Sequence, residues 1–472
     1  TQIKGLTATQ LKGLNATDVA ELSTTQVGAL SPTQIGALGA NFSALDATQV
    51  GALSTTQIKG LTTAQVSGLT TTDIGELSTT QIGALSADQV KSLSNAGLSA
   101  LDATQTGALT ATQVKGLTTT QINNLTTTDI GELTGTQLGA LNNSQLAALT
   151  QANVKALTTT QLGALSSSQI GAFAPSNFAA LDATQVGSLT ETQVKGLTTA
   201  QLGGLSAADV AELSATQVGA LSASQVGALS TTAVSALDAT QVGALSTTQI
   251  KGLTANQLKN FSTTDVGELS ETQVGALSAS QVGALSNAAL SALTATQVGA
   301  LSTTQIKGLT TTQVFNLTTT DIGELSATQV GALTADQIKN LNVTNLSALD
   351  ATQVGALTNT QVAALTTTQL KGLSVTDVGE LSATQVGALA AAQISALSQA
   401  QAQELSVTQI GGLSATQIAA LNTTNLTSLN ATQLGALSTT QLKGLTAAQL
   451  GSLSVANVGD LSETQVGALS AS

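Results

Sequence analysis

The chain has 472 residues and a net charge of −13 at pH 7, from 13 lysines and 26 acidic residues, and it contains no Cys, His, Met, Trp, Tyr or Arg. Without His or Cys it lacks a general base that titrates near neutral pH, a thiol nucleophile and an imidazole or thiolate metal ligand. We therefore expect no enzyme activity, no catalytic residues, no metal site and no cofactor.

Charge and hydropathy patterns exclude further classes. The acidic residues are scattered singly rather than clustered as in calcium-binding loops. No basic run with stacking aromatic side chains is present, so we expect no nucleic-acid binding. No apolar run approaches the roughly 20 residues that cross a bilayer, so we expect no membrane-spanning segment.

One short sequence motif is repeated along the whole chain. It reads LSTTQVGAL from Leu22 and LSPTQIGAL from Leu30, and its leucines recur every eight residues from Leu6 to Leu469. About 59 units of the form [S/T]-x-x-[Q/D/N]-[V/I/L]-x-x-L share this frame, with a single seven-residue step at Gly39 to Leu45. A short period kept over such a length predicts a solenoid, which we expect to run without a break over residues 1–472 and to belong to a longer chain.

Three backbones could carry an eight-residue repeat. In one continuous α-helix the apolar pair would drift by about 80° per unit and would never form a seam. A β-solenoid with 16-residue coils suits Thr and Val, but the apolar residues are three apart instead of two. A string of one-turn helices fits best, because Leu-Ser-x-x-Gln-Val combines a capping box with a hydrophobic staple. We predict an all-α superhelical solenoid, with the β-solenoid as the alternative.

Expected helices begin after the capping residue of each octad, for example over residues 24–27 after Ser23. Every octad places Ser, Thr, Asp or Asn at this N-cap except those with Gly39, Ala174 and Ala390. Asp replaces Gln at the third helical position in some octads: Asp18, Asp73, Asp129 and Asp209. Such an acid also suits the positive end of a helix dipole.

Prolines and glycines agree with this frame. Pro32 and Pro175 both fall at the first helical position, where the missing N–H costs nothing. Glycines such as Gly28 and Gly60 follow the aliphatic residue by one or two positions. We expect them to permit either a sharp exit from the helix or a close approach of two backbones. One octad buries too little apolar surface to offset the ordering of its backbone, so it must stack on its neighbours.

Acidic residues recur on a longer period. One series precedes a helix, and the other ends one. The first series is Asp46, Asp102, Asp182, Asp238 and Asp350, with Asn430 in register; the second is Glu76, Glu132, Glu212, Glu268, Glu324 and Glu380, with Asp460 in register. Most steps are 56 residues and two in each series are 80, or seven and ten octads. A superhelix of slightly more than three octads per turn brings both steps back to one side, so we expect the carboxylates to form stripes.

Rare residues mark irregular places. We expect four phenylalanines in the core and one, Phe315, exposed or in a contact; the core four are Phe42, Phe173, Phe178 and Phe261. Thr106 and Ala402 replace the aliphatic residue and predict weak points in the core. The lysines that follow the aliphatic residue, such as Lys59, Lys115, Lys195 and Lys251, are expected in solvent.

The words A-L-[ST]-x-x-Q-[VIL] resemble octapeptide tracts of very large secreted or surface adhesin-like proteins of Gram-negative bacteria. The resemblance implies a bacterial extracellular or cell-surface location and a fibre-forming or spacer role. We therefore expect a structural protein that forms a filament, sheath or stalk; the alternative is an extended surface that binds polysaccharide, another surface or ice.

The two periods together predict a shape. About 17 turns packed 8–10 Å apart would give a rod of about 140–170 Å. Ile3, Leu6, Val466 and Leu469 would then be bare at its ends, so we expect the chain's partner to be itself, through end-to-end or lateral self-assembly.

Overall fold

The computed structural model describes residues 2–469, which contain short α-helices, two 3-10 helices and no strand. The predicted all-α solenoid is confirmed, and the alternative of 16-residue β coils is excluded. The α-helices have four to seven residues, and successive helices follow the octad frame. Two compact units are formed, Thr1–Ala244 and Leu245–Ser472, which we call the N-terminal and C-terminal units. The single continuous array remains a prediction.

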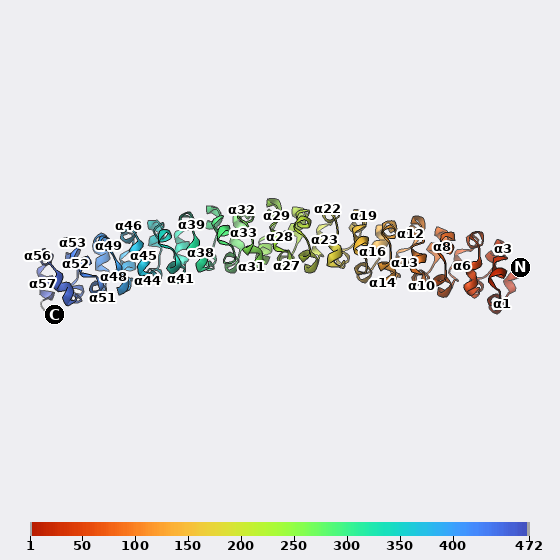
Figure 1. Ribbon diagram of the computed structural model, residues 1–472, viewed down its shortest axis with the longest axis horizontal. Helices are drawn as coiled ribbons and strands as arrows, with labels where there is room; N and C mark the ends of the chain where they lie inside the picture. Colours follow the sequence, from red (N-terminus) through yellow and green to blue (C-terminus); the bar gives the residue numbers. More distant parts are fainter. Residues whose placement is uncertain (1, 470–472) are drawn as a thin grey trace. The chain divides into compact units, whose positions relative to one another are not determined.

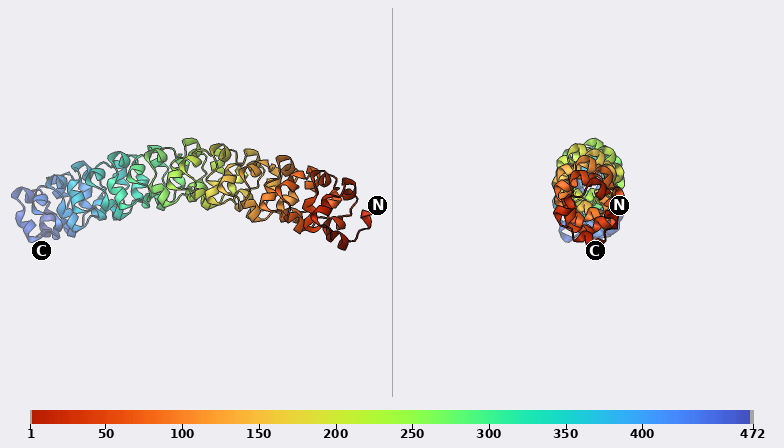
Figure 2. Two further views of the ribbon diagram at one scale, coloured as in Figure 1. Left: turned by 45° about the vertical axis from the view of Figure 1, so that its right-hand side comes forward. Right: turned by 90° about the vertical axis from the view of Figure 1, so that its right-hand side faces the viewer.

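The N-terminal unit consists of turns of short helices joined by short connections (Figure 1). In the end-on view of Figure 2 its first helices lie around the axis of the coil. Its helices are η1 (Ile3–Gly5), α1 (Ala8–Lys12), α2 (Ala16–Ala20), α3 (Thr24–Gly28), α4 (Pro32–Ala37), η2 (Gly39–Ala44), α5 (Ala47–Gly51), α6 (Thr55–Ile58), α7 (Thr63–Ser67), α8 (Thr71–Glu76), α9 (Thr79–Ala84), α10 (Ala87–Ser92), α11 (Asn95–Leu98), α12 (Ala103–Ala108), α13 (Ala111–Lys115), α14 (Thr119–Asn123), α15 (Thr127–Glu132), α16 (Gly135–Gly139), α17 (Asn143–Ala147), α18 (Gln151–Lys155), α19 (Thr159–Gly163), α20 (Ser167–Ile170), α21 (Pro175–Phe178), α22 (Ala183–Gly187), α23 (Glu191–Lys195), α24 (Thr199–Gly203), α25 (Ala207–Ala211), α26 (Ala215–Ala220), α27 (Ala223–Ala228), α28 (Thr231–Val234) and α29 (Ala239–Gly243).

The C-terminal unit is built in the same way (Figure 1). Its helices are α30 (Thr247–Gly252), α31 (Ala255–Lys259), α32 (Thr263–Gly267), α33 (Glu271–Ala276), α34 (Ala279–Val282), α35 (Asn287–Ser291), α36 (Ala295–Gly299), α37 (Thr303–Lys307), α38 (Thr311–Asn316), α39 (Thr319–Glu324), α40 (Ala327–Ala332), α41 (Ala335–Asn340), α42 (Val343–Leu346), α43 (Ala351–Gly355), α44 (Asn359–Ala364), α45 (Thr367–Gly372), α46 (Val375–Gly379), α47 (Ala383–Gly387), α48 (Ala391–Ala396), α49 (Gln399–Glu404), α50 (Val407–Gly411), α51 (Ala415–Ala420), α52 (Thr423–Thr427), α53 (Ala431–Gly435), α54 (Thr439–Lys443), α55 (Ala447–Ser452), α56 (Val455–Gly459) and α57 (Glu463–Leu469).

Most of the described helices start because the capping residue and the third residue exchange hydrogen bonds. In α3 the backbone N–H of Gln26 donates to Ser23 Oγ at 3.3 Å, and the N–H of Ser23 donates to Gln26 Oε1 at 2.8 Å. The exchange satisfies amide groups that a one-turn helix otherwise leaves open. Ala174 and Ala390 lack the side-chain cap, as predicted, although the N–H of Ala390 still donates to Gln393 Oε1 at 2.6 Å.

The winding is set by contacts between helices three apart, such as α7 with α10 and α10 with α13. The Gln89 side-chain amide of α10 donates to the carbonyl oxygens of Ile58 at 2.9 Å and Leu61 at 2.8 Å, 31 and 28 residues earlier. Helix α10 therefore sits over α7 and over the junction between α6 and α7. A turn takes slightly more than three octads, as the two long periods predicted.

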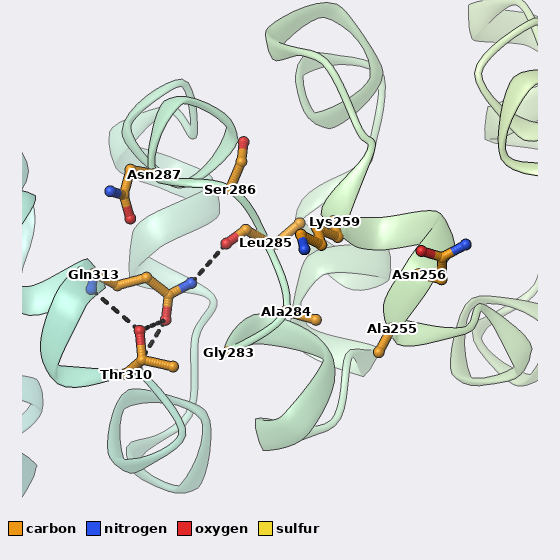
Figure 3. A pocket seen from close by; sticks show the side chains of 10 residues that line it. All are labelled: Ala255, Asn256, Lys259, Gly283, Ala284, Leu285, Ser286, Asn287, Thr310 and Gln313. Carbon is orange, nitrogen blue, oxygen red and sulfur yellow. Dashed lines mark hydrogen bonds between the residues drawn. The ribbon is translucent and has the colours of Figure 1, made fainter.

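These buried amides are the main polar link between turns. Figure 3 shows one in the C-terminal unit: Gln313 Oε1 accepts the N–H of Thr310 at 2.8 Å, while its Nε2 donates to the Leu285 carbonyl at 2.9 Å. The same Nε2 also donates to the Val282 carbonyl at 3.0 Å. One side chain thus caps its own helix and holds the preceding turn.

The aliphatic residues of each octad fill the core. Val27 and Leu30 are buried, as are most of their counterparts in each unit. The four phenylalanines predicted for the core are buried, whereas Phe315 is 57% exposed. Within each unit the core is a column, because most octads add the same two apolar side chains to it.

Glycine serves two purposes, and only one of them is widespread. Gly39, which begins η2 at the seven-residue step, has φ +57°, and no other described glycine has a positive φ. The described glycines other than Gly39 therefore leave their helices without a left-handed residue. At Gly60 a Cβ would lie 2.5 Å from the Pro32 carbonyl oxygen, so close approach between turns is the reason for glycine there.

We predict that Gln113→Glu destabilises the chain at neutral pH. The buried Gln113 Nε2 donates to the carbonyls of Ile82 and Leu85 at 2.9 and 2.7 Å, and a carboxylate would place a charged acceptor against both. The free energy of unfolding in urea should fall by at least about 2 kcal/mol. Thr112→Glu, which adds the same charge at an exposed position of α13, should change it by less than about 0.5 kcal/mol. Equal effects would contradict the inter-turn role of the glutamine.

Candidate functional site

Carboxylates gather on one side of successive turns in the N-terminal unit. Asp46 caps α5, and α5 contacts α8, which carries Asp73 and Glu76. Both aspartates act electrostatically on Glu76. Helix α12, capped by Asp102, lies on α8, because Gln105 Nε2 donates to the carbonyls of Ile74 and Leu77 at 2.9 and 2.7 Å.

We call this set the acidic column of the N-terminal unit. Its members are Asp46, Asp73, Glu76, Asp102, Asp129, Glu132, Asp182, Asp209, Glu212 and Asp238. The column climbs by contacts or amide links through α5, α8, α12, α15, α18, α22, α25 and α29. From one helix of the column to the next, the helix number rises alternately by three and by four, so seven octads make two turns of the coil. The 80-residue interval contains one additional step of three helices, from α15 to α18. The predicted stripe is thus present in this unit.

A second acidic column lies in the C-terminal unit. Asp321 and Glu324 belong to α39, and α43, capped by Asp350, lies on that helix. The contact is made by Gln353 Nε2, which donates to the carbonyls of Ile322 and Leu325 at 2.9 and 2.6 Å. The same arrangement of caps and turns therefore recurs within each unit.

Asp at the third helical position keeps the cap and loses the inter-turn link. Asp73 Oδ2 accepts the N–H of Thr70 at 2.7 Å, but a carboxylate has no N–H to offer to the preceding turn. Besides the four aspartates predicted at this position, Asp265, Asp321 and Asp377 occupy it. In the sequence, each of these three aspartates is followed three positions later by a glutamate, and this spacing could have identified them.

Several of these aspartates accept a hydroxyl from the preceding turn. Ser99 Oγ donates to Asp129 Oδ2 at 2.8 Å, and Ser347 Oγ donates to Asp377 Oδ2 at 2.8 Å. In the C-terminal unit Ser291 Oγ donates to Asp321 Oδ2 at 2.7 Å. Serine thus supplies the donor that glutamine supplies elsewhere, in the opposite direction along the coil.

The glutamates at the C-terminal ends of these helices include the acidic residues with unsatisfied oxygen atoms. The Oε2 atoms of Glu76, Glu212 and Glu380 are buried and have no hydrogen-bond partner among the described residues. Burial raises the pKa of Glu76 above its ordinary value, and the charges of Asp73 and Asp46 raise it further. For Glu212 burial, Asp209 and Asp182 raise the pKa in the same order. In the C-terminal unit, burial and Asp321 raise the pKa of Glu324.

Thr106 is a special case rather than a simple weak point in the core. It is buried at a position that usually holds Val or Ile, and its Oγ1 donates to Glu132 Oε2 at 3.2 Å. Sequence reasoning saw the lost aliphatic side chain and missed the partner, which lies 26 residues later in the next turn. Ala402, the other predicted weak point, is buried without a polar side chain.

The outer members of the column are solvated. The pKa of Asp102 lies below its ordinary value, because the backbone N–H of Gln105 and the hydroxyl of Thr104, each at 2.8 Å, donate to its carboxylate. The lysines Lys59, Lys115 and Lys195 are exposed, as predicted. Exposed charges of this kind interact weakly with one another.

The arrangement offers negative charge and hydrogen-bond acceptors. In residues 2–469, no group of three or more carboxylates is placed to hold a metal ion. An open groove of about 560 Å³ between α31, α34 and α38 is lined mostly by small and amide side chains, with Lys259 at its edge (Figure 3). None of the described helices has the length and apolar character needed to traverse a bilayer.

We predict that Asp73→Gln stabilises the N-terminal unit. The longer amide can keep the cap on Thr70 and also donate to the preceding turn, while a charge beside Glu76 is removed. The free energy of unfolding should rise by about 1 kcal/mol. Asp88→Gln removes a charge at an exposed position of α10 and serves as the control. A loss of stability in Asp73→Gln would show that the aspartate is held by contacts absent from this account.

Comparison with known proteins supports the repeat architecture. A family model described as "ALTTAQ repeat" matches six stretches, residues 3–40, 42–79, 138–175, 194–231, 224–255 and 279–311, which together cover slightly less than half of the chain. No curated protein matched the chain. The chain is therefore a repeat-based protein whose octads are similar to the ALTTAQ repeat.

Proposed function

We propose that the chain is a structural repeat protein without enzymatic activity, which builds an extracellular filament or sheath or holds another domain away from a bacterial surface. The observation that carries the proposal is the inter-turn amide link, which recurs from Gln34 near the start to Gln465 near the end of the described residues. A repeated link between the turns is what a load-bearing spacer requires.

The link also explains how such a protein can be lengthened. Most octads contribute one aliphatic pair to the core and one amide to the preceding turn, so another octad can be added without a new kind of contact. Solenoid stability is a sum of such nearest-neighbour terms. Length is then the property that the sequence can change most easily, as suits a stalk or fibre.

The extracellular, bacterial setting rests on the resemblance to octapeptide tracts of Gram-negative surface proteins. A structural or binding role agrees with the ALTTAQ repeat matches. The alternative within this setting is an extended surface for polysaccharide or ice, since some helices, such as α6 with Thr55 and Thr56, begin with two exposed hydroxyl residues.

Electron microscopy of the purified 472-residue chain, over a range of concentrations, tests the proposal. We expect slender particles of uniform width that join end to end or side by side as concentration rises. Antibodies to the chain should label intact cells of the source bacterium. Compact globular particles, or labelling only after permeabilisation, would contradict it. Saturable binding to a glycan array by single particles would favour the alternative.

A further inference from the structure

The buried carboxylate oxygens of the acidic column stand out from the rest of the N-terminal unit. Glu76 ends α8, and Glu212 follows α25, at a position where most octads have Ala or Gly. Their side chains are partly exposed, yet each has an Oε2 atom that is buried and without a partner. Leaving a charged acceptor unpaired in a buried place is costly.

The unit contains its own control for this arrangement. Glu132 occupies the corresponding position in α15, and its Oε2 accepts the hydroxyl of Thr106, 26 residues earlier. Counting back 26 residues from Glu76 and Glu212 leads to Val50 and Val186, which are buried and have no donor. The presence or absence of one hydroxyl therefore separates the paired glutamate from the two orphaned ones.

The charged groups on the helices packed around the two orphaned oxygens are all negative. Around Glu76 these are Asp73 on its own helix, Asp46 at the cap of α5 and Asp102 at the cap of α12; α11, which also contacts α8, carries no charge. The helices packed around Glu212 have no lysine either. Their charged groups are the three aspartates Asp182, Asp209 and Asp238, while α28 is uncharged.

We propose that Glu76 and Glu212 make the N-terminal unit sensitive to protons: in mildly acidic solution they become neutral and the turns around them close more firmly, while at neutral pH their charge loosens those turns. The Thr106–Glu132 turn is insensitive, because a hydroxyl already satisfies its carboxylate. This regulation goes beyond the proposed function, since it holds for a stalk, a filament or a binding surface.

The direction follows from linkage. The pKa of each of these two carboxyls is raised above its ordinary value of 4.5 in the folded chain. The folded state therefore binds the proton more tightly than the unfolded state, and stability rises as the pH falls through the raised pKa. The gain is complete below the ordinary value and is absent at neutral pH.

Hydrogen exchange of the full 472-residue chain, followed by mass spectrometry at pH 7 and pH 5, tests the proposal locally. Each variant is compared with the parent chain at the same pH, so that intrinsic exchange rates cancel. Glu76→Gln should slow exchange in residues 46–77 severalfold at pH 7 and have much less effect at pH 5, and Glu212→Gln should do the same in residues 182–213. An equal effect at both pH values would overturn the proposal.

A second set of variants in the same experiment adds or removes the hydroxyl group that pairs with the glutamate. Val50→Thr copies the Thr106 arrangement and should remove most of the pH dependence of residues 46–77. Thr106→Val should create a third sensitive turn in residues 102–133, whereas Thr106→Ser, which keeps a hydroxyl, should not. If Thr106→Val leaves that stretch as insensitive to pH as the parent, the orphaned oxygen is not the cause and the proposal fails.

Discussion

The glutamine at the third position of most short helices is the residue on which the rest of the structure depends. Its Oε1 closes the capping box of its own helix, and its Nε2 satisfies carbonyls one turn below, as at Gln89 and Gln313. Secondary and tertiary structure are thus joined in one buried side chain. A helix of one turn is unstable alone, so this double use allows so small a unit to be repeated.

Side-chain length and chemistry explain what happens when glutamine is replaced. Asn153 and Asn425 are too short to do both tasks: each reaches a leucine carbonyl 28 residues earlier, at 3.0 and 2.7 Å, and forms no reciprocal bond with its cap. Asp73 does the opposite, since it holds the cap and has no donor for the preceding turn. The acidic columns are therefore places where the link between turns is weaker and where pH can act.

Much of this fold could be predicted from sequence because the features of each octad depend on residues that are close in the chain. Capping boxes, the positions of Pro32 and Pro175 and the aliphatic core all depend on neighbours within eight residues. The two long periods were enough to place the carboxylates on one side, because residues separated by a whole number of turns lie on the same side of a coil. The partner of each glutamine amide was hidden, since nearly identical octads do not reveal which turn a side chain reaches. The hydrogen-bond partner of Thr106 was hidden for the same reason, because Glu132 lies in another turn.

The central claim is that side-chain amides, together with the apolar column, hold the turns in register. An experimental density map of the 472-residue chain that resolves side chains tests it most directly. The account predicts glutamine amides within hydrogen-bond distance of the carbonyl oxygens 28 and 31 residues earlier, throughout each unit. Glutamine side chains that point into solvent, or that pair with one another across extended strands, would contradict it.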